Sequence, residues 1–142
     1  MKISTKGRYG LKAMIDIAVY SSENEYVSLK SISQRQNISE AYLEQIISSL
    51  KKGGLVVSSR GASGGYMLKT DASEIRVGEI LRLLEDTFKV VKCSDNSCCT
   101  EDCNGCISKG VWDKLSQSVN EAANSIFLSE LVEEYKQKNN LK

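Results

Sequence analysis

Hydrophobic and polar positions in the first third of the chain follow a helical period. Apolar side chains recur three and four residues apart over residues 5–21, which predicts an amphipathic helix. The same spacing predicts a second helix at 29–36 and a third after Ser39, and Ser28 and Ser39 are suited to cap these two helices. Asn37, a residue type that tolerates a left-handed backbone, lies in the turn between them. Two short helices joined by such a turn predict a helix-turn-helix.

The pattern then becomes that of a β-hairpin. Gly53 and Gly54 end the third helix, and residues 55–59 and 66–69 each have the composition of a strand. The glycine-rich stretch 60–65 between them predicts a turn. A hairpin directly after a helix-turn-helix is called a wing. The fold class that we predict is therefore mainly α with a small β-hairpin, a winged helix-turn-helix.

Helical spacing returns in the second half, where a fourth helix is predicted around residues 77–84 and a short last helix around 128–135. Between them a long helix carries apolar residues in steps of three and four, as in a coiled-coil seam: Trp112, Leu115, Val119, Ala122 and Ile126. Either the chain's own N-terminal part or a second copy could cover this seam. We favour a second copy and expect a homodimer.

These patterns divide the chain into three parts. We predict a DNA-binding domain at 1–86, a cysteine-rich sensor loop at 87–107, and a dimerisation helix with a C-terminal helix at 108–137.

The charge is unevenly distributed. Residues 1–70 carry ten Lys or Arg and five Asp or Glu, whereas residues 71–142 carry nine and thirteen. A basic N-terminal half suits a polyanionic partner such as double-stranded DNA. We see no apolar run of membrane-spanning length and no secretory signal, so we expect a cytoplasmic protein that does not bind a membrane. Histidine is absent, which removes imidazole as a general base or metal ligand.

Candidate base contacts follow from the geometry of the helix-turn-helix, in which the N-terminal residues of the second helix reach base edges. The candidates on this helix are Ala41, Tyr42, Glu44 and Gln45. Glutamine can pair with adenine, glutamate can accept from the cytosine amino group, and an alanine methyl can contact a thymine methyl. The alternative for each residue is an ordinary solvated position.

Basic side chains supply the remaining candidate DNA contacts. Arg60 opens the wing turn, where an arginine can enter a minor groove or reach guanine. Four cations are candidate phosphate contacts, which position a protein without reading sequence: Lys6, Arg8, Lys51 and Lys52.

All five cysteines lie between residues 93 and 106. In an intracellular protein such a concentration favours a metal, a cluster or a redox-active thiol over a buried core. We favour an iron–sulfur cluster, and the alternatives are a reversible thiol–disulfide switch and a zinc ion. An enzymatic thiol oxidoreductase using Cys103 and Cys106 lacks a supporting catalytic residue, and we predict that the chain is not an enzyme.

Several stretches resemble the IscR/NsrR/CymR family of bacterial regulators. They are STKGRYGLKAM at 4–14, ISEAYLEQI at 38–46, RGASGGYML at 60–68, VGEI at 77–80, and the cysteines before the pair at 111–112. The resemblance implies a homodimer whose long helices cross at the interface, an operator of two related half-sites and, for many members, an iron–sulfur cluster. It also matches Glu44, Gln45 and Arg60 to base-reading positions.

The resemblance assigns three cluster ligands, Cys93, Cys106 and one of the pair at 98–99. The fourth ligands known in the family are missing here, because Lys109 replaces a histidine of one branch and Arg8 replaces an acidic residue of another.

With no histidine available, an all-cysteine site takes four thiolates. We predict the ligands Cys93, Cys99, Cys103 and Cys106, with Cys98 as the alternative to Cys99. Whether the cluster is [2Fe–2S] or [4Fe–4S] stays open.

The function that we predict is a dimeric DNA-binding transcriptional regulator, a repressor, that senses cluster or redox status through its cysteines. The alternative is a regulator of cysteine or sulfur metabolism, or a thiol-based redox sensor without a cluster.

Overall fold

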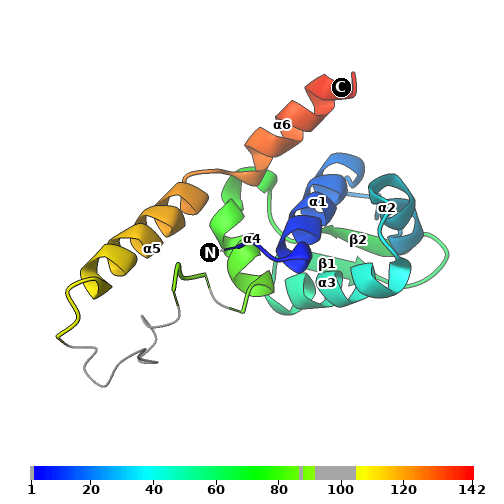
Figure 1. Ribbon diagram of the computed structural model, residues 1–142. Helices are drawn as coiled ribbons and strands as arrows, with labels where there is room; N and C mark the ends of the chain where they lie inside the picture. Colours follow the sequence, from blue (N-terminus) through cyan, green and yellow to red (C-terminus); the bar gives the residue numbers. More distant parts are fainter. Residues whose placement is uncertain (1, 87, 92–104) are drawn as a thin grey trace.

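The computed structural model describes residues 2–86, 88–91 and 105–142 (Figure 1). The N-terminal half contains α1 (Thr5–Tyr20), α2 (Leu29–Gln36), α3 (Glu40–Lys52), β1 (Val56–Ser59) and β2 (Gly65–Leu68). The short 3₁₀ turn η1 (Ala72–Glu74) and α4 (Val77–Leu84) follow, and then come α5 (Lys109–Asn124) and α6 (Leu128–Lys138). Three helices followed by a hairpin are the predicted winged helix-turn-helix.

Local side-chain signals set the ends of α2 and α3. The Ser28 hydroxyl accepts from the Ser31 backbone N–H at 3.1 Å, and the Ser39 hydroxyl accepts from that of Tyr42 at 3.3 Å. Asn37 ends α2 in the left-handed conformation, with φ 54°. Both serine caps and the asparagine turn are therefore as predicted.

Helix α4 spans the predicted residues 77–84, and the 3₁₀ turn η1 before it was not predicted. The Asp71 carboxylate caps η1 by accepting from the Ser73 backbone N–H at 2.9 Å, and this hydrogen bond lowers the pKa of Asp71. The backbone is extended at Ile75 and Arg76 before α4 begins. The polar cap of the 3₁₀ turn competes with early helix formation.

The main core is aliphatic and joins all the elements of the N-terminal half. Its fully buried side chains include Met14, Ile17, Ile32, Leu43, Ile46, Leu50 and Ile80. Leu128 and Val132 of α6 belong to the same core, so the C-terminal helix completes the domain that carries the helix-turn-helix. The predicted division at residues 86 and 107 stays a prediction.

A close approach between α1 and α4 supports this core. A Cβ at Gly10 would overlap Leu84 Cδ1, so this glycine allows the two helices to pack tightly. A smaller cluster on the other side of α4 contains Val77, Leu81, Phe88 and Ala123. It attaches α5 to the domain.

The wing is a two-stranded antiparallel sheet in which Val56 pairs with Leu68 and Ser59 with Gly65. Val27 adds a bridge on the free side of β2, since its N–H and C=O each bond to Tyr66 at 2.8 Å. Gly65 has φ 152°, and a Cβ there would overlap the Val27 carbonyl. Glycine is therefore required where the connection between α1 and α2 meets the hairpin.

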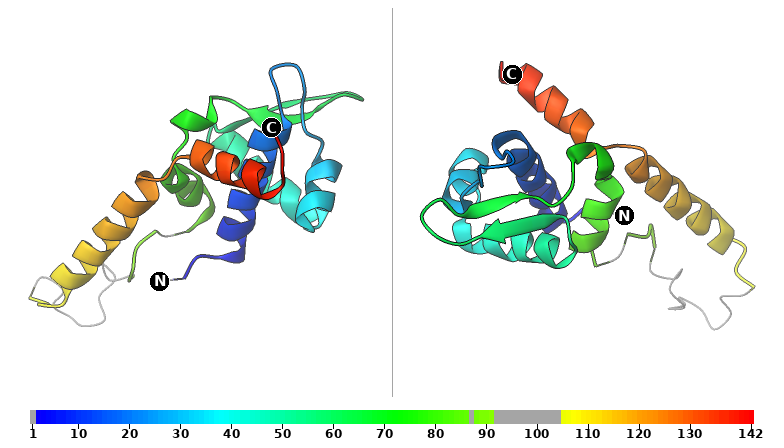
Figure 2. Two further views of the ribbon diagram at one scale, coloured as in Figure 1. Left: turned by 90° about the horizontal axis from the view of Figure 1, so that it is seen from above. Right: turned by 180° about the vertical axis from the view of Figure 1, so that it is seen from behind.

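Figure 2 shows α5 pointing away from the bundle, whereas α6 turns back across α1. Within the described part of the chain, no helix combines the length and the apolar character needed to cross a membrane.

Candidate nucleic-acid interface

The second helix of the helix-turn-helix, α3, separates an inner face from an outer one. Its buried residues are Leu43, Ile46, Ile47 and Leu50. Because these anchor the helix in the core, Ala41, Glu44, Gln45 and Ser48 are turned to solvent. A polar outer face on a firmly packed helix is what reading of base edges requires.

The structure brings Lys6 of α1 beside this outer face. A shallow hollow is lined by Lys6, Ala41, Glu44, Gln45, Ser48, Ser49 and Lys52. Three of the four candidate base contacts on α3 and two candidate phosphate contacts thus share one surface. Lys6 and Lys52 line the same hollow as Glu44 and Gln45. Their positive charges offset the repulsion between the Glu44 carboxylate and a phosphate backbone.

Sequence reasoning missed two hairpin residues next to this surface. Ser58 and Tyr66, which face each other across β1 and β2, line a second hollow together with Glu44, Ser48 and Lys51. Only the strand register reveals them. The sequence offered no signal for them beyond their place in the two predicted strands.

Tyr42 lies differently from the other candidates. It is half-buried, and its ring meets Tyr9 of α1 edge to face with the centroids 6.1 Å apart. The Lys12 ammonium lies 5.7 Å from the Tyr9 ring centroid. The Tyr42 ring is thus used in packing, which leaves its hydroxyl for a polar contact.

The remaining candidates lie at the edges of the surface. Arg60 is exposed at the end of β1, where the wing turn begins, and it does not line either hollow beside α3. Arg8 is exposed and donates to the Thr5 hydroxyl at 3.3 Å. Lys51 is exposed in the last turn of α3.

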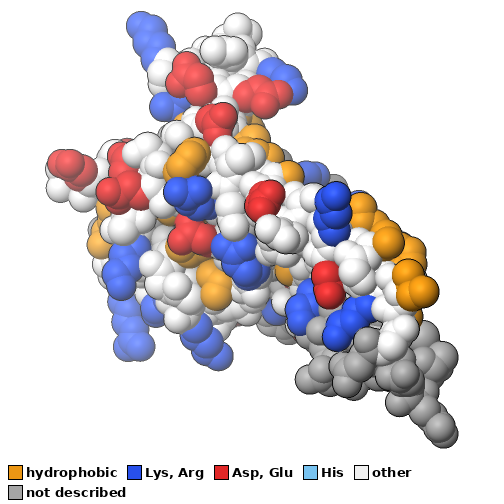
Figure 3. Space-filling model, turned by 90° about the vertical axis from the view of Figure 1, so that its left-hand side faces the viewer, with side chains coloured by type: hydrophobic (Ala, Val, Ile, Leu, Met, Phe, Trp, Pro, Cys, Tyr) orange, Lys and Arg blue, Asp and Glu red, His pale blue; other side chains and the backbone are white. Residues whose placement is uncertain are grey.

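An apolar row is uncovered along α5 and directly after it. Val111 and Leu115 of α5 are 53% and 44% exposed. Ile126, predicted as the last seam residue of the long helix, lies after the helix ends at Asn124 and is 39% exposed. Hydrophobic side chains form a row down the right side of the molecule in Figure 3. Of the other predicted seam residues, Trp112 is half-buried and Ala122 is exposed.

The predicted seam residue Val119 packs against the small cluster that contains Val77, Leu81 and Phe88 of its own chain. One face of α5 therefore packs on its own domain, and a neighbouring apolar face of the same helix is exposed to solvent.

Four of the five cysteines, Cys93, Cys98, Cys99 and Cys103, lie outside the described residues. Cys106 is half-buried just before α5, and its Sγ lies 3.1 Å from the Ser108 hydroxyl. Among the residues that the structure describes, no group of three or more Cys, Asp or Glu side chains could hold a metal.

Both sides of the cysteine-bearing stretch are attached to α5. The Val90 backbone N–H donates to the buried Ser116 hydroxyl at 2.9 Å. The Asn120 amide donates to the Phe88 carbonyl at 3.2 Å and to the Ser116 carbonyl at 2.9 Å. Residues just before the cysteines are thus bound to the helix that begins just after them.

Helix α5 is joined in turn to α4 by polar contacts. Arg82 donates to the Asn124 side chain at 2.9 Å, and Arg76 donates to the Asn124 carbonyl at 2.8 Å. These contacts bind the C-terminal end of α5 to α4, which packs on α1 and α3.

The profile of the Rrf2 family, described as "Iron-dependent Transcriptional regulator", matches residues 3–134. The chain belongs to the Rrf2 family. The predicted family resemblance is confirmed.

Individual Rrf2-type proteins show the same likeness. The "HTH-type transcriptional regulator IscR" of Serratia proteamaculans (strain 568) is 42% identical over 135 residues, which cover 93% of this chain and 79% of the relative. The solved structure "T. potens IscR" has a TM-score of 0.77 and 41% identity, and the match covers 97% of this chain and 90% of that one.

A solved structure of CymR, titled "the Global Cysteine Regulator of B. subtilis", is as similar in shape. It has a TM-score of 0.77 and 40% identity, with 94% of this chain and 97% of that chain covered.

These likenesses establish an IscR-like Rrf2 transcriptional regulator of the helix-turn-helix type, which implies DNA binding. They confirm the predicted winged fold, and they confirm that the chain is not an enzyme, since its relatives are named as regulators. The individual DNA-contact, cluster and interface residues stay predictions.

Proposed function

We propose that the chain is a dimeric cytoplasmic repressor whose affinity for an operator of two half-sites changes with the state of its cysteines. The observation that carries the proposal is the exposed apolar row formed by Val111, Leu115 and Ala122 of α5, with Ile126 directly after the helix. An isolated helix face of this kind is costly in water and suits burial against a symmetric copy. Two copies joined through α5 carry two α3 helices, as two half-sites require.

In each copy, α3 reads the bases with Ala41, Glu44 and Gln45. Tyr42 contributes its hydroxyl, and Arg60 contacts the DNA next to the major groove that α3 occupies, either in the minor groove or at a guanine. The phosphate contacts are made by Lys6, Arg8 and Lys51. This assignment is supported by the shared hollow of α1 and α3 and by the exposure of Arg60 at the wing turn.

The sensor that we propose is an iron–sulfur cluster held by Cys93, Cys99, Cys103 and Cys106, with Cys98 as the alternative to Cys99. The donor set fits, because thiolates are the usual ligands of such clusters. Cys106 precedes the N-terminus of α5, whose dipole favours a thiolate. When bound, the cluster supplies iron that oxidants attack, and α5 is the element next to it.

The similarity to CymR favours a second candidate, since that structure matches as well as IscR does. In this candidate the cysteines form a thiol–disulfide switch without iron, or the signal comes from cysteine metabolism.

Iron and sulfide analysis of anaerobically purified protein separates the two candidates. DNA binding is measured on a duplex selected by the wild-type protein from a random-sequence library. A cluster regulator contains iron and sulfide in stoichiometric amounts, and removing them changes the affinity for this duplex. Iron-free protein whose affinity changes with thiol oxidants instead supports the second candidate.

The dimer is tested with Val111→Asp combined with Leu115→Asp. These two residues are exposed in the single chain, so the variant keeps its own core, whereas Val119→Asp would also damage the cluster around Phe88. Sedimentation should yield a monomer. Gln117→Lys, which adds a charge on the far side of α5, should stay dimeric. A dimeric double variant would place the interface elsewhere.

A further inference from the structure

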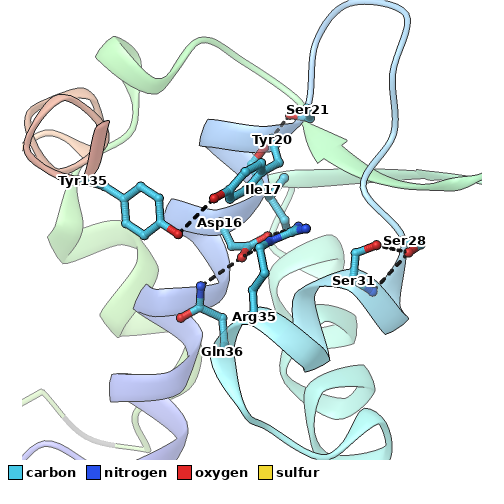
Figure 4. Close-up of polar contacts among 9 residues, drawn as sticks. All are labelled: Asp16, Ile17, Tyr20, Ser21, Ser28, Ser31, Arg35, Gln36 and Tyr135. Carbon is cyan, nitrogen blue, oxygen red and sulfur yellow. Dashed lines mark hydrogen bonds and ion pairs between the residues drawn. The ribbon is translucent and has the colours of Figure 1, made fainter. Parts of the chain in front are cut away.

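A buried carboxylate joins α1 to the end of α2 (Figure 4). Asp16 is fully buried and accepts from Arg35 Nε at 2.9 Å, from Arg35 Nη2 at 2.7 Å and from Gln36 Nε2 at 2.9 Å. The hydrogen bonds to Asp16 hold the pKa of Arg35 above its ordinary value. A two-point pair of this kind fixes the plane of the guanidinium group as well as its position.

Tyr20 and Tyr135 extend this contact to the C-terminal helix. The Arg35 guanidinium lies 3.9 Å from the centroid of the Tyr20 ring, and the Tyr20 hydroxyl lies 3.2 Å from that of Tyr135. The two tyrosine rings meet edge to face with centroids 6.2 Å apart. Figure 4 shows the continuous arrangement from Tyr135 through Tyr20 and Arg35 to Asp16. One connected set of polar groups therefore links α6, α1 and α2.

We infer that Tyr135 and Tyr20 are positioning residues for DNA recognition, through which α6 sets the orientation of α2 and hence of α3. Arg35 and Gln36 lie in the last turn of α2, and only residues 37–39 separate that turn from α3. A shift of the Arg35 plane therefore moves the start of the helix that faces DNA. The inference rests on the proposed function only in taking α3 as the reading helix.

The chemistry of the set favours orientation over stability. A buried ion pair is weak evidence for stability, because well-packed apolar groups often do as well in its place. The two-point contact of Arg35 with Asp16 does fix the geometry of the pair. The C-terminal helix is itself held firmly, because the Leu128 N–H donates to the Ile75 carbonyl and the Val77 N–H to the Ile126 carbonyl. Helix α6 follows α5 after residues 125–127. Through α6, the set therefore connects the helix-turn-helix to the C-terminal end of α5, the helix that we propose forms the dimer interface.

The same residues also border the wing. Tyr20 and Arg35 line a hollow of about 400 Å³ together with Ala62, Ser63 and Gly64 of the wing turn. The wing turn thus borders the set, and α3 follows α2 after residues 37–39.

The test uses Tyr135→Phe, Tyr20→Phe and the double variant, which remove hydroxyl groups and keep the rings. Each single variant should lower the affinity for the selected duplex by about 3- to 10-fold, the range expected for one hydrogen bond. The double variant should bind no more weakly than the weaker single one, because both remove the same bond. Tyr26→Phe is the control, since no hydrogen bond of the Tyr26 hydroxyl is found in the described structure; its affinity should be unchanged.

Two further measurements separate positioning from simple stabilisation. The hydrogen bond between the Tyr20 and Tyr135 hydroxyls, which favours the protonated form of Tyr135, raises the pKa of Tyr135 to about 12. NMR titration of ring-labelled tyrosine should find this high value in the wild type and a value nearer the ordinary 10.0 in Tyr20→Phe. Amide hydrogen exchange in Tyr135→Phe should increase in α2 and at Asn37, and not only in α6.

The outcomes are distinct. Folded Tyr135→Phe that binds like the wild type, or faster exchange confined to α6, overturns the inference and leaves the proposed function intact. Wild-type protein that selects no duplex contradicts the proposed function, and the exchange pattern alone then decides the inference.

Discussion

The Glu85 carboxylate accepts two hydrogen bonds from Ser4, from the backbone N–H at 3.0 Å and from the hydroxyl at 2.9 Å. The same hydroxyl accepts from the Gly7 backbone N–H at 3.0 Å and so caps α1. Glu85 is the C-cap residue directly after α4. The first turn of α1, which carries Lys6, is thus held by the residue that follows α4.

Removing the Ser4 hydroxyl should therefore weaken two contacts at once. We expect Ser4→Ala to lower the free energy of unfolding by about 2 kcal/mol, because it removes a helix cap and a donor to a charged acceptor. Urea unfolding followed by circular dichroism measures the change. Thr5→Ala, which removes only an exposed contact with Arg8, should cost much less. Equal losses in the two variants would contradict the role assigned to Ser4.

Arg60 provides a test of the wing. Arg60→Ala should weaken binding to the selected duplex by about 1–3 kcal/mol if the guanidinium makes a good base contact. Lys69, which directly follows β2, carries the same charge at the end of the hairpin away from the turn. Lys69→Ala should weaken binding less than Arg60→Ala does, and this loss should disappear at high salt. Titrations at two salt concentrations distinguish them. If both variants lost the same affinity at both salt concentrations, Arg60 would contribute only general electrostatic attraction to DNA.

The contact between Val90 and Ser116 can be broken without changing side-chain size greatly. Ser116→Ala leaves the Val90 N–H without its acceptor, which should cost about 1–3 kcal/mol. Amide hydrogen exchange at Val90 should become faster. The matched control is Ser118→Ala on the exposed part of α5, which should leave exchange at Val90 as in the wild type.

The cysteine assignment predicts different results for two serine variants. Cys106→Ser should lose the iron and the visible absorbance of anaerobically reconstituted protein, because it removes a proposed ligand next to α5. Cys98→Ser should retain both. Full iron loading of Cys106→Ser would remove this residue from the ligand set.

The high pKa of Tyr135 also predicts how stability depends on pH. The pKa is about 12 in the folded protein against an ordinary 10.0, so the folded state keeps a proton that the unfolded state loses. The contribution of Tyr135 is therefore fully present below pH 10 and is lost as the pH rises through about 12. The difference in urea midpoint between the wild type and Tyr135→Phe should narrow between pH 9.5 and 11. A constant difference would show that the phenol is not perturbed.

Elements with local signals could be predicted from the sequence. The caps Ser28 and Ser39 and the turn residue Asn37 act within three or four residues of the chain, so the helix-turn-helix was predicted closely. The 3₁₀ turn before α4 was not predicted, because it is only three residues long and carries no helical period of apolar side chains.

Contacts between distant residues could not be predicted. Asp16 and Arg35 are 19 positions apart, and Tyr20 and Tyr135 are 115 apart, so no periodicity relates them. Val119 illustrates a second limit. A step of three and four residues identifies an apolar stripe, but it does not say which surface covers each member, and Val119 packs on its own chain.

The bridge between Val27 and Tyr66 has a consequence for the search that a wing makes along DNA. Bonds on both edges of β2 make it the middle strand of a short three-stranded patch, close to the turn end of the hairpin. We expect bending of the wing backbone to be concentrated in the turn at 60–64, which Arg60 begins. In the proposed groove contact of Arg60, a backbone restricted in this way has less entropy to lose, so a larger share of the contact energy is left for discriminating between sequences.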